Sequence, residues 1–236
     1  VVALNGTRAE ADIASSLQAY WPLDNNGNDQ IGSIDLSASG GAGFDTVNQL
    51  VGVAAGQTTE VSGNFRGGWV SDLAHGSTFG ITNEVTISSW YRLDVLGSSG
   101  EKSSFRYLHN EPAGPNAGAE QFVGWYSPDN ATNYYHRAVG DGGAVTSSSM
   151  GIGTDVGSWY HVVQRVDSSG NAEFWHEKET SADHSGVDNT FTLPGYTMLD
   201  TANMVNGQIL TAYYEGKGGS GQVSSDEVAI WNRALT

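Results

Sequence analysis

The sequence predicts an all-β protein in which many short strands form a sandwich or a barrel, and three observations lead to this prediction. Short apolar runs with period-two alternation recur along the 236 residues. Gly supplies 32 of these residues, and Ser, Thr, Asn and Asp fill the spaces between the runs, which is a composition typical of tight turns. The sequence has no heptads and no amphipathic stretch longer than about three helical turns. Short strands separated by turns are typical of sandwiches and barrels.

Eight segments carry the clearest strand signal: residues 17–23, 84–94, 104–109, 121–126, 133–139, 158–167, 171–177 and 227–234. A hairpin turn is predicted at Val166–Asn171, where Gly170 is free to take a positive φ. Three stretches, 97–102, 111–119 and 178–200, are predicted to be long loops, and functional residues of sandwiches often lie on such loops.

The chain is expected to form a single domain over residues 1–236, with residues 1–16 as a linker or an irregular lead-in. No internal repeat and no long Gly/Ser or Pro-rich linker divides it. The count of zero cysteines excludes disulfides and thiolate metal sites. No run of 18 apolar residues is present, so no membrane span is expected. Residues 1–16 do not form a signal peptide, so the signal of an exported parent protein would lie outside this chain.

The charge balance restricts the partners. Asp and Glu number 26 against 10 Lys and Arg, which gives a formal net charge of −16. Nucleic-acid binding depends on basic side chains that neutralise phosphates, so a nucleic acid is not expected as a partner. An anionic membrane surface would also repel this chain. The acidic surface suits capture of a hard cation such as Ca²⁺.

Four segments, in order, resemble the laminin G-like family of bacterial extracellular proteins. They are LQAYWPLDNNGND (17–29), NEVTISSWYRL (83–93), GSWYHVVQRVDSSGNAEFW (157–175) and SSDEVAIWNRALT (224–236). The last is the most specific of the four. The resemblance implies an antiparallel two-sheet jelly roll of the concanavalin A-like kind, whose first and last strands lie side by side. The Trp residues of these two strands, Trp21 and Trp231, are as expected where the ends seal a common core.

The resemblance also implies a structural Ca²⁺ ion near the junction of the two end strands. Calcium takes six to eight oxygen ligands. The turn after the first strand offers carboxylate and amide oxygens, and Asp226 and Glu227 approach it if the ends pair. The expected metal ligands are Asp24, Asp29, Asp226 and Glu227. The alternative is that Asp and Asn occur there only because they favour turns.

A ligand-binding sheet face is the second candidate site. Alternation in strand 84–94 separates Trp90 and Arg92 from the apolar Ile87 and Tyr91, and one of these sets must face away from the core. An aromatic ring can cover the apolar side of a sugar, while planar donors pair with its hydroxyls or carboxylates. The candidate carbohydrate-binding residues are Trp90, Arg92, Tyr107, His109, Trp125, Tyr135 and Arg137. The alternative is that strand aromatics form the core and strand arginines pair with neighbouring acids.

Four arginines lie in predicted strands of this acidic chain, which favours an anionic glycan as the ligand: Arg92, Arg106, Arg137 and Arg165. In strand 171–177, alternation also sets Glu173, Trp175 and Glu177 on one side.

No recognisable catalytic motif is present. Jelly-roll glycosidases carry a Glu-x-Asp-x-(x)-Glu strand that aims two carboxyl groups into one cleft. Glu10-Ala11-Asp12 begins this pattern, but Ala14 and Ser15 occupy the positions of the last Glu. The six histidines are scattered, and no nucleophile elbow or phosphate loop occurs.

The sequence therefore predicts a non-catalytic carbohydrate-binding module of a secreted bacterial polysaccharide-degrading or surface protein, linked to other domains and holding a structural calcium. Its location would be extracellular or at the cell surface. Two alternatives stay open. One is an adhesion or structural module of a large cell-surface protein, and the other is a jelly-roll polysaccharide lyase or glycosidase.

Overall fold

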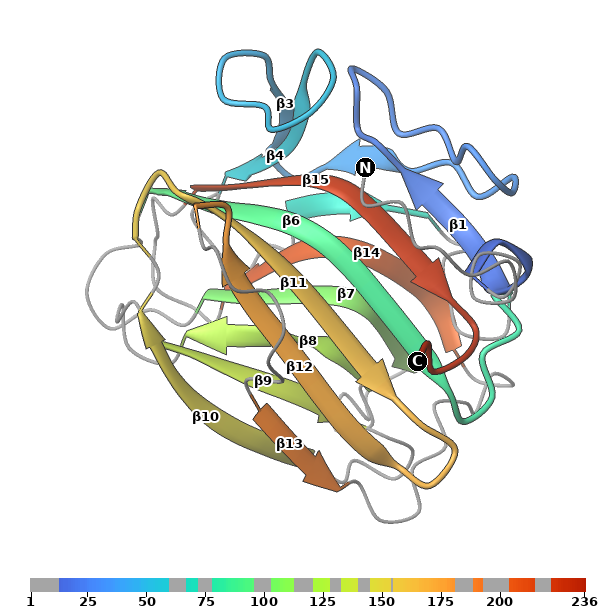
Figure 1. Cartoon of the computed structure of the whole chain (residues 1–236). Helices are drawn as coiled ribbons and strands as arrows, with labels where there is room; N and C mark the ends of the chain where they lie inside the picture. The colour runs from blue at the N-terminus through green and yellow to red at the C-terminus, as the bar shows by residue number, and fades with distance from the viewer. Residues whose placement is uncertain are drawn as a thin grey trace.

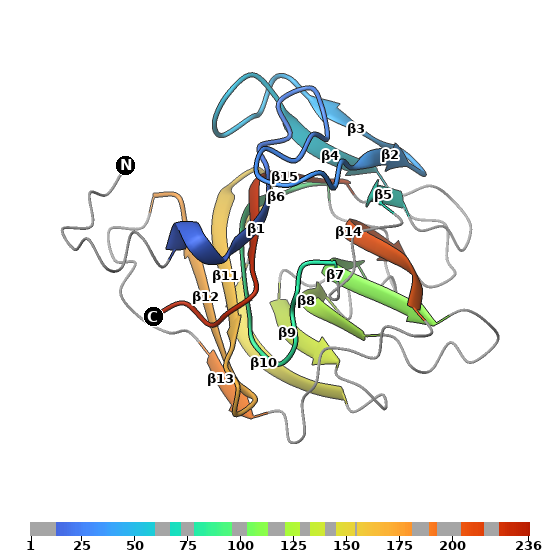
Figure 2. The same ribbon diagram turned by 90° about the vertical axis from the view of Figure 1, so that its right-hand side faces the viewer.

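Fifteen strands make up most of the described chain, and they pair into two antiparallel sheets. The computed structural model describes residues 13–59, 67–71, 78–95, 103–112, 121–127, 133–139, 145–153, 155–180, 189–192, 204–214 and 222–236. The two sheets stack as separate layers (Figures 1 and 2), which confirms the predicted sandwich. Within the described ranges, no helix is long and apolar enough to cross a membrane.

The eight-stranded layer, sheet A, consists of β1 (Leu17–Trp21), β3 (Ala42–Asp45), β4 (Ala55–Thr59), β6 (Val85–Val95), β11 (Trp159–Val166), β12 (Asn171–Lys178), β13 (Asn189–Thr192) and β15 (Gln222–Trp231). Its order is β13-β12-β11-β6-β15-β4-β3, with β1 also pairing with β15.

The seven-stranded layer, sheet B, consists of β2 (Ser37–Ser39), β5 (Gly67–Val70), β7 (Ser103–Pro112), β8 (Gln121–Ser127), β9 (Asn133–Val139), β10 (Val145–Gly153) and β14 (Met204–Tyr214). Its order is β10-β9-β8-β7-β14-β5-β2.

The two ends of the described chain pair, as the resemblance implied. Strand β1 runs antiparallel to β15, with Ala19 opposite Ile230 and Trp21 opposite Val228 (Figure 1). Trp21 is fully buried and packs edge-on against Phe79, with ring centroids 6.1 Å apart. The expectation for the other terminal Trp is wrong, because Trp231 is only partly buried and donates its indole N–H to a carbonyl near the start of β1.

The hydrophobic core lies between the sheets. On β6 the odd-numbered apolar residues face it, with Ile87 and Tyr91 at most 2 % exposed, whereas Trp90 and Arg92 are only partly buried. The β11–β12 hairpin shows the same alternation, with Val162 and Phe174 in the core. Strand alternation thus sends one face of sheet A inward and leaves the other, which we call the outer face, outside the core.

The β11–β12 hairpin has the predicted turn. The Gly170 amide donates to the Asp167 carbonyl at 2.8 Å, and Gly170 takes φ 79°. The Asp167 carboxylate accepts hydrogen bonds from Asn171, which lower the pKa of Asp167 together with the amide of Ser169. This tight turn fixes the register of the two strands and so determines which residue of β11 lies opposite which residue of β12.

Some predicted boundaries are wrong. The closing strand spans Gln222–Trp231 rather than 227–234, because Ser224 and Ser225 continue the ladder as small buried residues between two neighbouring strands. The predicted loop 178–200 contains β13, and the predicted loop 111–119 begins inside β7. Residues 13–16 form a helical turn, while residues 1–12 of the predicted lead-in lie outside the described chain.

Candidate functional site

The outer face of sheet A carries aligned rows of polar and aromatic side chains. Strand register places His161 between Trp90 on β6 and Glu177 on β12. In the next rows, Val163 lies opposite Trp175, and Arg165 lies opposite Glu173. Residues directly opposite each other on antiparallel strands share a face, so these side chains form one continuous surface.

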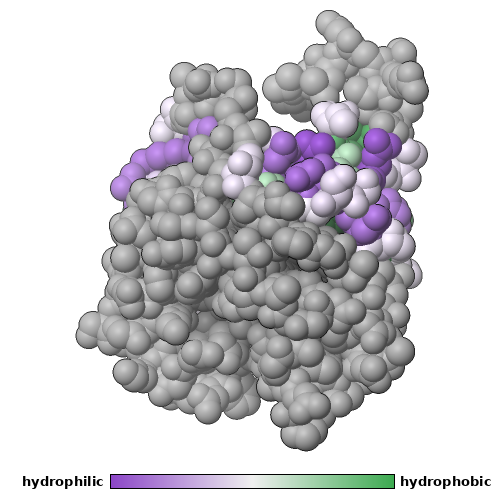
Figure 3. Space-filling view, turned by 90° about the horizontal axis from the view of Figure 1, so that it is seen from below, coloured by the Kyte–Doolittle hydropathy of each residue, from purple (hydrophilic) through white to green (hydrophobic). Residues whose placement is uncertain are grey.

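A hollow of about 620 Å³ lies on this face, and we call it the outer-face pocket. It is lined by Thr86, His161, Val163, Arg165, Trp175, Glu177, Leu235 and Thr236. This volume is in the range of small-molecule binding sites, and such sites combine apolar walls with a few polar groups. Seen from below, the described surface of the molecule is mainly hydrophilic with small apolar areas (Figure 3).

The chain after β15 forms one wall of the pocket. The Thr86 hydroxyl donates to the Arg233 carbonyl at 2.8 Å and accepts from the Leu235 amide at 3.0 Å. The Glu84 carboxylate also accepts from the Ala234 amide. These bonds hold the segment that contributes Leu235 and Thr236 against the start of β6.

On the side of the pocket nearest β6, an aromatic ring stacks against the lining residue His161. The rings of Trp90 and His161 lie 4.8 Å apart at an interplanar angle of 25°. The Ser88 hydroxyl and the His161 Nε2 atom are 2.8 Å apart and share a hydrogen bond. Trp90 therefore supports a lining residue, which places one of the predicted sugar-binding residues beside the pocket.

The charged groups of the pocket differ in their partners. Arg165 forms an ion pair with Glu173, the residue opposite it on β12. In the described ranges, no hydrogen bond or ion pair involves the Glu177 side chain, which is partly exposed. The partly exposed Trp175 likewise has no ring contact there. Trp175 and Glu177 thus line the pocket without a side-chain hydrogen bond, ion pair or ring contact to another described residue.

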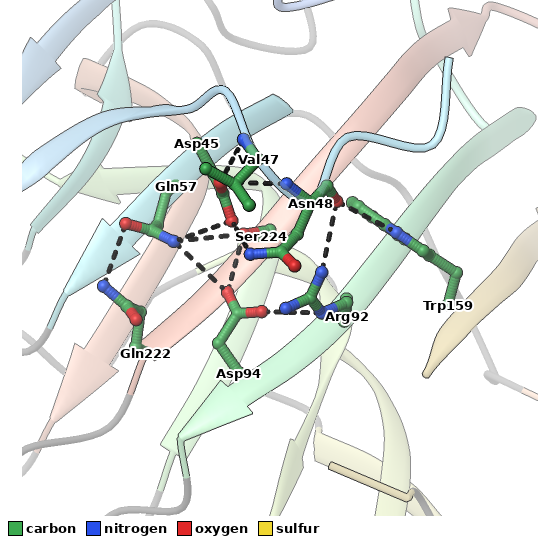
Figure 4. Close-up of polar contacts among 9 residues, drawn as sticks. All are labelled: Asp45, Val47, Asn48, Gln57, Arg92, Asp94, Trp159, Gln222 and Ser224. Atoms are coloured by element: carbon green, nitrogen blue, oxygen red, sulfur yellow. Dashed lines mark hydrogen bonds and ion pairs between the residues drawn. The ribbon is translucent and has the colours of Figure 1, made fainter. Parts of the chain in front are cut away.

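Arg92, another predicted sugar-binding residue, belongs to a separate polar network on the outer face (Figure 4). Its Nε lies 2.8 Å from the Asp94 Oδ1 atom as an ion pair, and its guanidinium donates to the Asn48 carbonyl. The indole of Trp159 donates to the same carbonyl at 3.1 Å. Asp94 in turn accepts from the Ser224 hydroxyl at 2.6 Å. Burial raises the pKa of Asp94, against the lowering by Ser224 and Arg92.

This network fastens the β3–β4 connection to sheet A. The Asp45 carboxylate accepts hydrogen bonds from the amides of Val47 and Asn48 and from the Asn48 side chain (Figure 4). Desolvation acts to raise the pKa of Asp45, but these hydrogen bonds outweigh it and lower the pKa. Gln57 joins Asp45 to Asp94 through its amide nitrogen. Arg92 is therefore engaged in fixing a loop.

The other five predicted sugar-binding residues lie in sheet B, and their side chains are outside the described ones. Tyr107 and His109 are in β7, Trp125 in β8, and Tyr135 and Arg137 in β9. They cannot share a sheet face with Trp90 and Arg92, which belong to sheet A. The seven residues thus divide between two layers.

Register also separates the sheet B residues. Trp125 lies opposite His136, whereas Arg137 lies opposite Gly124, one position away. Tyr107 falls at a register shift between β7 and β8. Trp125 is thus out of phase with Arg137 and does not share a row with it.

The predicted metal ligands lie around the β1–β15 junction in two groups. The Asp29 carboxylate accepts hydrogen bonds from the amides of Tyr20, Ile31 and Ile34. Asp29 thus organises its own turn, as the alternative interpretation of that segment expects.

Asp24 and Asp226 both accept hydrogen bonds from backbone amides of the β3–β4 loop. Asp24 accepts hydrogen bonds from the amides of Val53 and Ala54, and Asp226 Oδ2 accepts from those of Leu50 and Val51 at 3.1 Å. Gly52 lies between these amides at φ 71°, and a Cβ there would collide with the Asp24 carboxylate. The loop backbone can approach Asp24 so closely because residue 52 is a glycine.

Asp226 is fully buried, and its Oδ1 atom has no hydrogen-bond partner among the described residues. Burial is the largest cause that raises its pKa to about 7, and the nearby Glu227 adds to it. Glu227 takes φ 54° at an irregularity of β15 and accepts a hydrogen bond from the Tyr20 hydroxyl. Burial raises the Tyr20 pKa, as do the hydrogen bond to Glu227 and the negative charges of Glu227, Asp226 and Asp24.

A buried carboxylate oxygen without a donor is compatible with a cation ligand, and Asp24 and Glu227 supply further oxygens nearby. Within the described ranges, no group of three or more His, Asp or Glu side chains is arranged to hold a metal by itself. Main-chain carbonyls would have to complete the coordination. Asp24, Asp226 and Glu227 lie around this junction without forming a three-residue metal group among the described residues, and Asp29 accepts hydrogen bonds within its own turn.

Arg165, Trp175 and Glu177 lie in predicted strands, but neither they nor His161 belong to the set of sugar-binding residues predicted from the sequence. A usable signal exists in the sequence, because the tight turn at Asp167–Gly170 dictates which residues of the hairpin face each other. No comparable sequence pattern predicts that the segment after β15 forms a wall of the pocket.

The sequence matches no family model and no curated protein. The fold nevertheless matches solved structures. Botulinum neurotoxin type C, described as interacting with two ganglioside molecules, superimposes with TM-score 0.64 at 11 % identity over 96 % of this chain and 50 % of that one. The binding domain of Paraclostridial Mosquitocidal Protein 1 gives 0.61 at 12 % identity, covering 95 % and 50 %.

A third match is a sialidase of Trypanosoma rangeli, a mutant displaying trans-sialidase activity. It superimposes with TM-score 0.57 at 16 % identity over 94 % of this chain and 32 % of the sialidase chain. The chain thus spans half or less of the length of these proteins. At such low identity the likeness concerns the fold alone.

Proposed function

We propose that this chain is a carbohydrate-binding module of the laminin G-like kind, within a secreted or cell-surface protein, and that its sugar site is the outer-face pocket. The observation that carries the proposal is Trp175, a partly exposed indole in a pocket of sugar-accommodating size. The flat apolar face of an indole suits the C–H side of a pyranose, and Glu177 offers an acceptor for its hydroxyls.

The comparisons support this proposal only through the fold. The matched neurotoxin is described as interacting with gangliosides, which are lipids that carry sugars. The sialidase is an enzyme, so the same fold occurs in proteins of more than one activity. The pocket, rather than the structural neighbours, therefore carries the proposal.

Affinity electrophoresis against neutral, acidic and amino polysaccharides tests the proposed function. We expect migration to be retarded by at least one of them, without release of reducing ends or unsaturated products. Retardation with product release would instead establish a lyase or a glycosidase. The absence of retardation across the panel would contradict the sugar-binding proposal and favour an adhesion or structural module.

Trp175→Ala is expected to weaken binding of the retained polysaccharide by about thirtyfold, the usual effect of truncating a central aromatic contact. Trp175→Phe is the matched control, because it keeps an aromatic face at the same position and should retain most of the affinity. Titration calorimetry measures both variants, and equal affinity of wild type and Trp175→Ala would rule out the pocket as the site.

We also propose that a structural Ca²⁺ binds at the β1–β15 junction, with Asp226 as its principal side-chain ligand and Asp24 and Glu227 beside it. The supporting observation is the buried Asp226 Oδ1 atom, for which the described part of the chain provides no hydrogen-bond donor. When bound, the cation would neutralise the buried charge and join the β3–β4 loop to both end strands.

Calcium at about a hundredfold above its Kd is expected to stabilise the wild type by about 2.7 kcal/mol, which raises Tm by roughly 5–10 °C. Asp226→Asn should lose this response, while its side-chain oxygen can still accept from the Leu50 and Val51 amides. Differential scanning calorimetry with calcium and with chelator measures both proteins. An equal calcium shift in wild type and variant would exclude Asp226 as a ligand.

A further inference from the structure

We infer that the outer-face pocket selects a sugar that carries a protonated amino group, as in a glycan of partly deacetylated glucosamine, rather than an acidic glycan. This inference rests on the proposed function, and it narrows the ligand class of the same site. It follows from which charged side chains of the pocket are already paired and which are not.

The charge of the pocket's arginine is already matched by a carboxylate. The Arg165 guanidinium forms an ion pair with the Glu173 carboxylate on the neighbouring strand. This pair has little net attraction for an acidic sugar, whose charge the carboxylates of Glu173 and Glu177 would also repel. Arg92, the other strand arginine whose side chain is described, is likewise paired with Asp94. The expectation of an anionic glycan therefore has no support from these two arginines.

The available charge of the pocket is negative. Glu177 lines the pocket, is partly exposed and has no partner among the described residues. Thr86, another polar lining residue, already donates to one backbone group and accepts from another. A ligand that pairs with Glu177 gains a charge-assisted hydrogen bond if it brings an ammonium group.

Trp175 adds a second attraction for the same group. It precedes Glu177 by two residues on β12, so the two side chains share a face, and their Cα atoms are about 7 Å apart. An indole face attracts cations as well as the C–H face of a sugar ring. A sugar stacked on Trp175 can therefore place an amino substituent towards Glu177.

The whole chain favours the same ligand class. With a formal net charge of −16, its field attracts cationic ligands and repels anionic ones during encounter. This long-range attraction is not specific to the pocket, so the test compares a variant that removes a charge inside the pocket with one that removes the same charge outside it.

The test compares glucosamine oligomers, the matching N-acetylglucosamine oligomers and oligogalacturonate by titration calorimetry, at mildly acidic pH where the amine is protonated. We expect the glucosamine oligomer to bind about tenfold more tightly than the acetylated one. Glu177→Gln should abolish this preference, so that the amino and acetylated oligomers bind the variant equally. Glu179→Gln removes the same charge from an exposed position in the turn after β12, so it should retain the preference.

The outcomes separate the two proposals. Equal binding of the amino and acetylated oligomers, or tighter binding of oligogalacturonate, would overturn the inference and leave sugar binding intact. Failure of all oligomers to bind would overturn the proposed function and the inference with it. A lysine oligopeptide that binds as tightly as the glucosamine oligomer would show that the pocket reads an ammonium group without a sugar, which also contradicts the inference.

Discussion

Trp21→Ala is expected to destabilise the protein by about 4 kcal/mol, which is a large part of the stability of an ordinary domain. Trp21 is fully buried in β1 and packs edge-on against Phe79. Its indole also donates to the Ile34 carbonyl at 2.8 Å, so truncation leaves a buried acceptor without a partner as well as a cavity. The free energy of unfolding in urea measures the loss.

Two further variants make this prediction specific. Trp21→Phe keeps a ring against Phe79 but loses the hydrogen bond, so we expect a smaller cost of about 1–2 kcal/mol. Trp175→Ala changes a partly exposed Trp of the same sheet and should cost clearly less than Trp21→Ala. Equal costs for Trp21→Ala and Trp175→Ala would contradict the account of the chain-end junction.

The second large effect is a loss of stability in acid that is due to His176. This side chain is 6 % exposed, and burial lowers its pKa from 6.5 to about 4. Its Nε2 atom shares a hydrogen bond with the Tyr91 hydroxyl at 2.5 Å, and its ring stacks on Tyr160 at 4.8 Å. The unfolded chain binds the proton more readily than the folded one.

The stability that a neutral His176 contributes is therefore complete above pH 6.5 and is lost as the pH falls towards 4. The full loss is about 3 kcal/mol. Asp226 acts in the opposite direction, because its pKa is raised to about 7 and the folded state then holds its proton more strongly. The measurement is the difference in unfolding free energy between wild type and His176→Gln across this pH range. The contribution of Asp226 is present in both proteins and drops out of this difference. A difference that is independent of pH would contradict the prediction.

Features that depend on local sequence were predictable. The turn at Asp167–Gly170 carries its own chemistry, and the alternation of β6 separates core from surface without knowledge of the rest of the fold. The pairing of β1 with β15 followed from the resemblance of their motifs to a known family.

Features that depend on neighbours in space were not predictable. Ser224 and Ser225 resemble a loop by composition, but β4 and β6 on either side make them part of a central strand. The irregularity at Glu227 turns Asp226 into a buried side chain, which alternation alone does not indicate. The pocket wall at Leu235 depends on a hydrogen bond to Thr86, far away in the sequence.

The predicted sugar-binding residues are divided between two sheets for the same reason, namely that their neighbours in space cannot be read from the sequence. Aromatic and basic residues at alternate positions look alike in every strand, and only sheet order tells that β6 lies in a different layer from β7, β8 and β9. The hairpin register offered better information, since it brings Trp175 and Glu177 opposite Val163 and His161.

The indole N–H resonances of the seven tryptophans, followed by NMR during titration with a bound oligosaccharide, test the position of the sugar site most directly. Trp175→Phe assigns the resonance of interest by its disappearance. We predict a saturable shift of the Trp175 resonance, while that of Trp21, which is buried and hydrogen-bonded to Ile34, stays unchanged. Saturable shifts confined to other tryptophans, with Trp175 unaffected, would contradict sugar binding in the outer-face pocket.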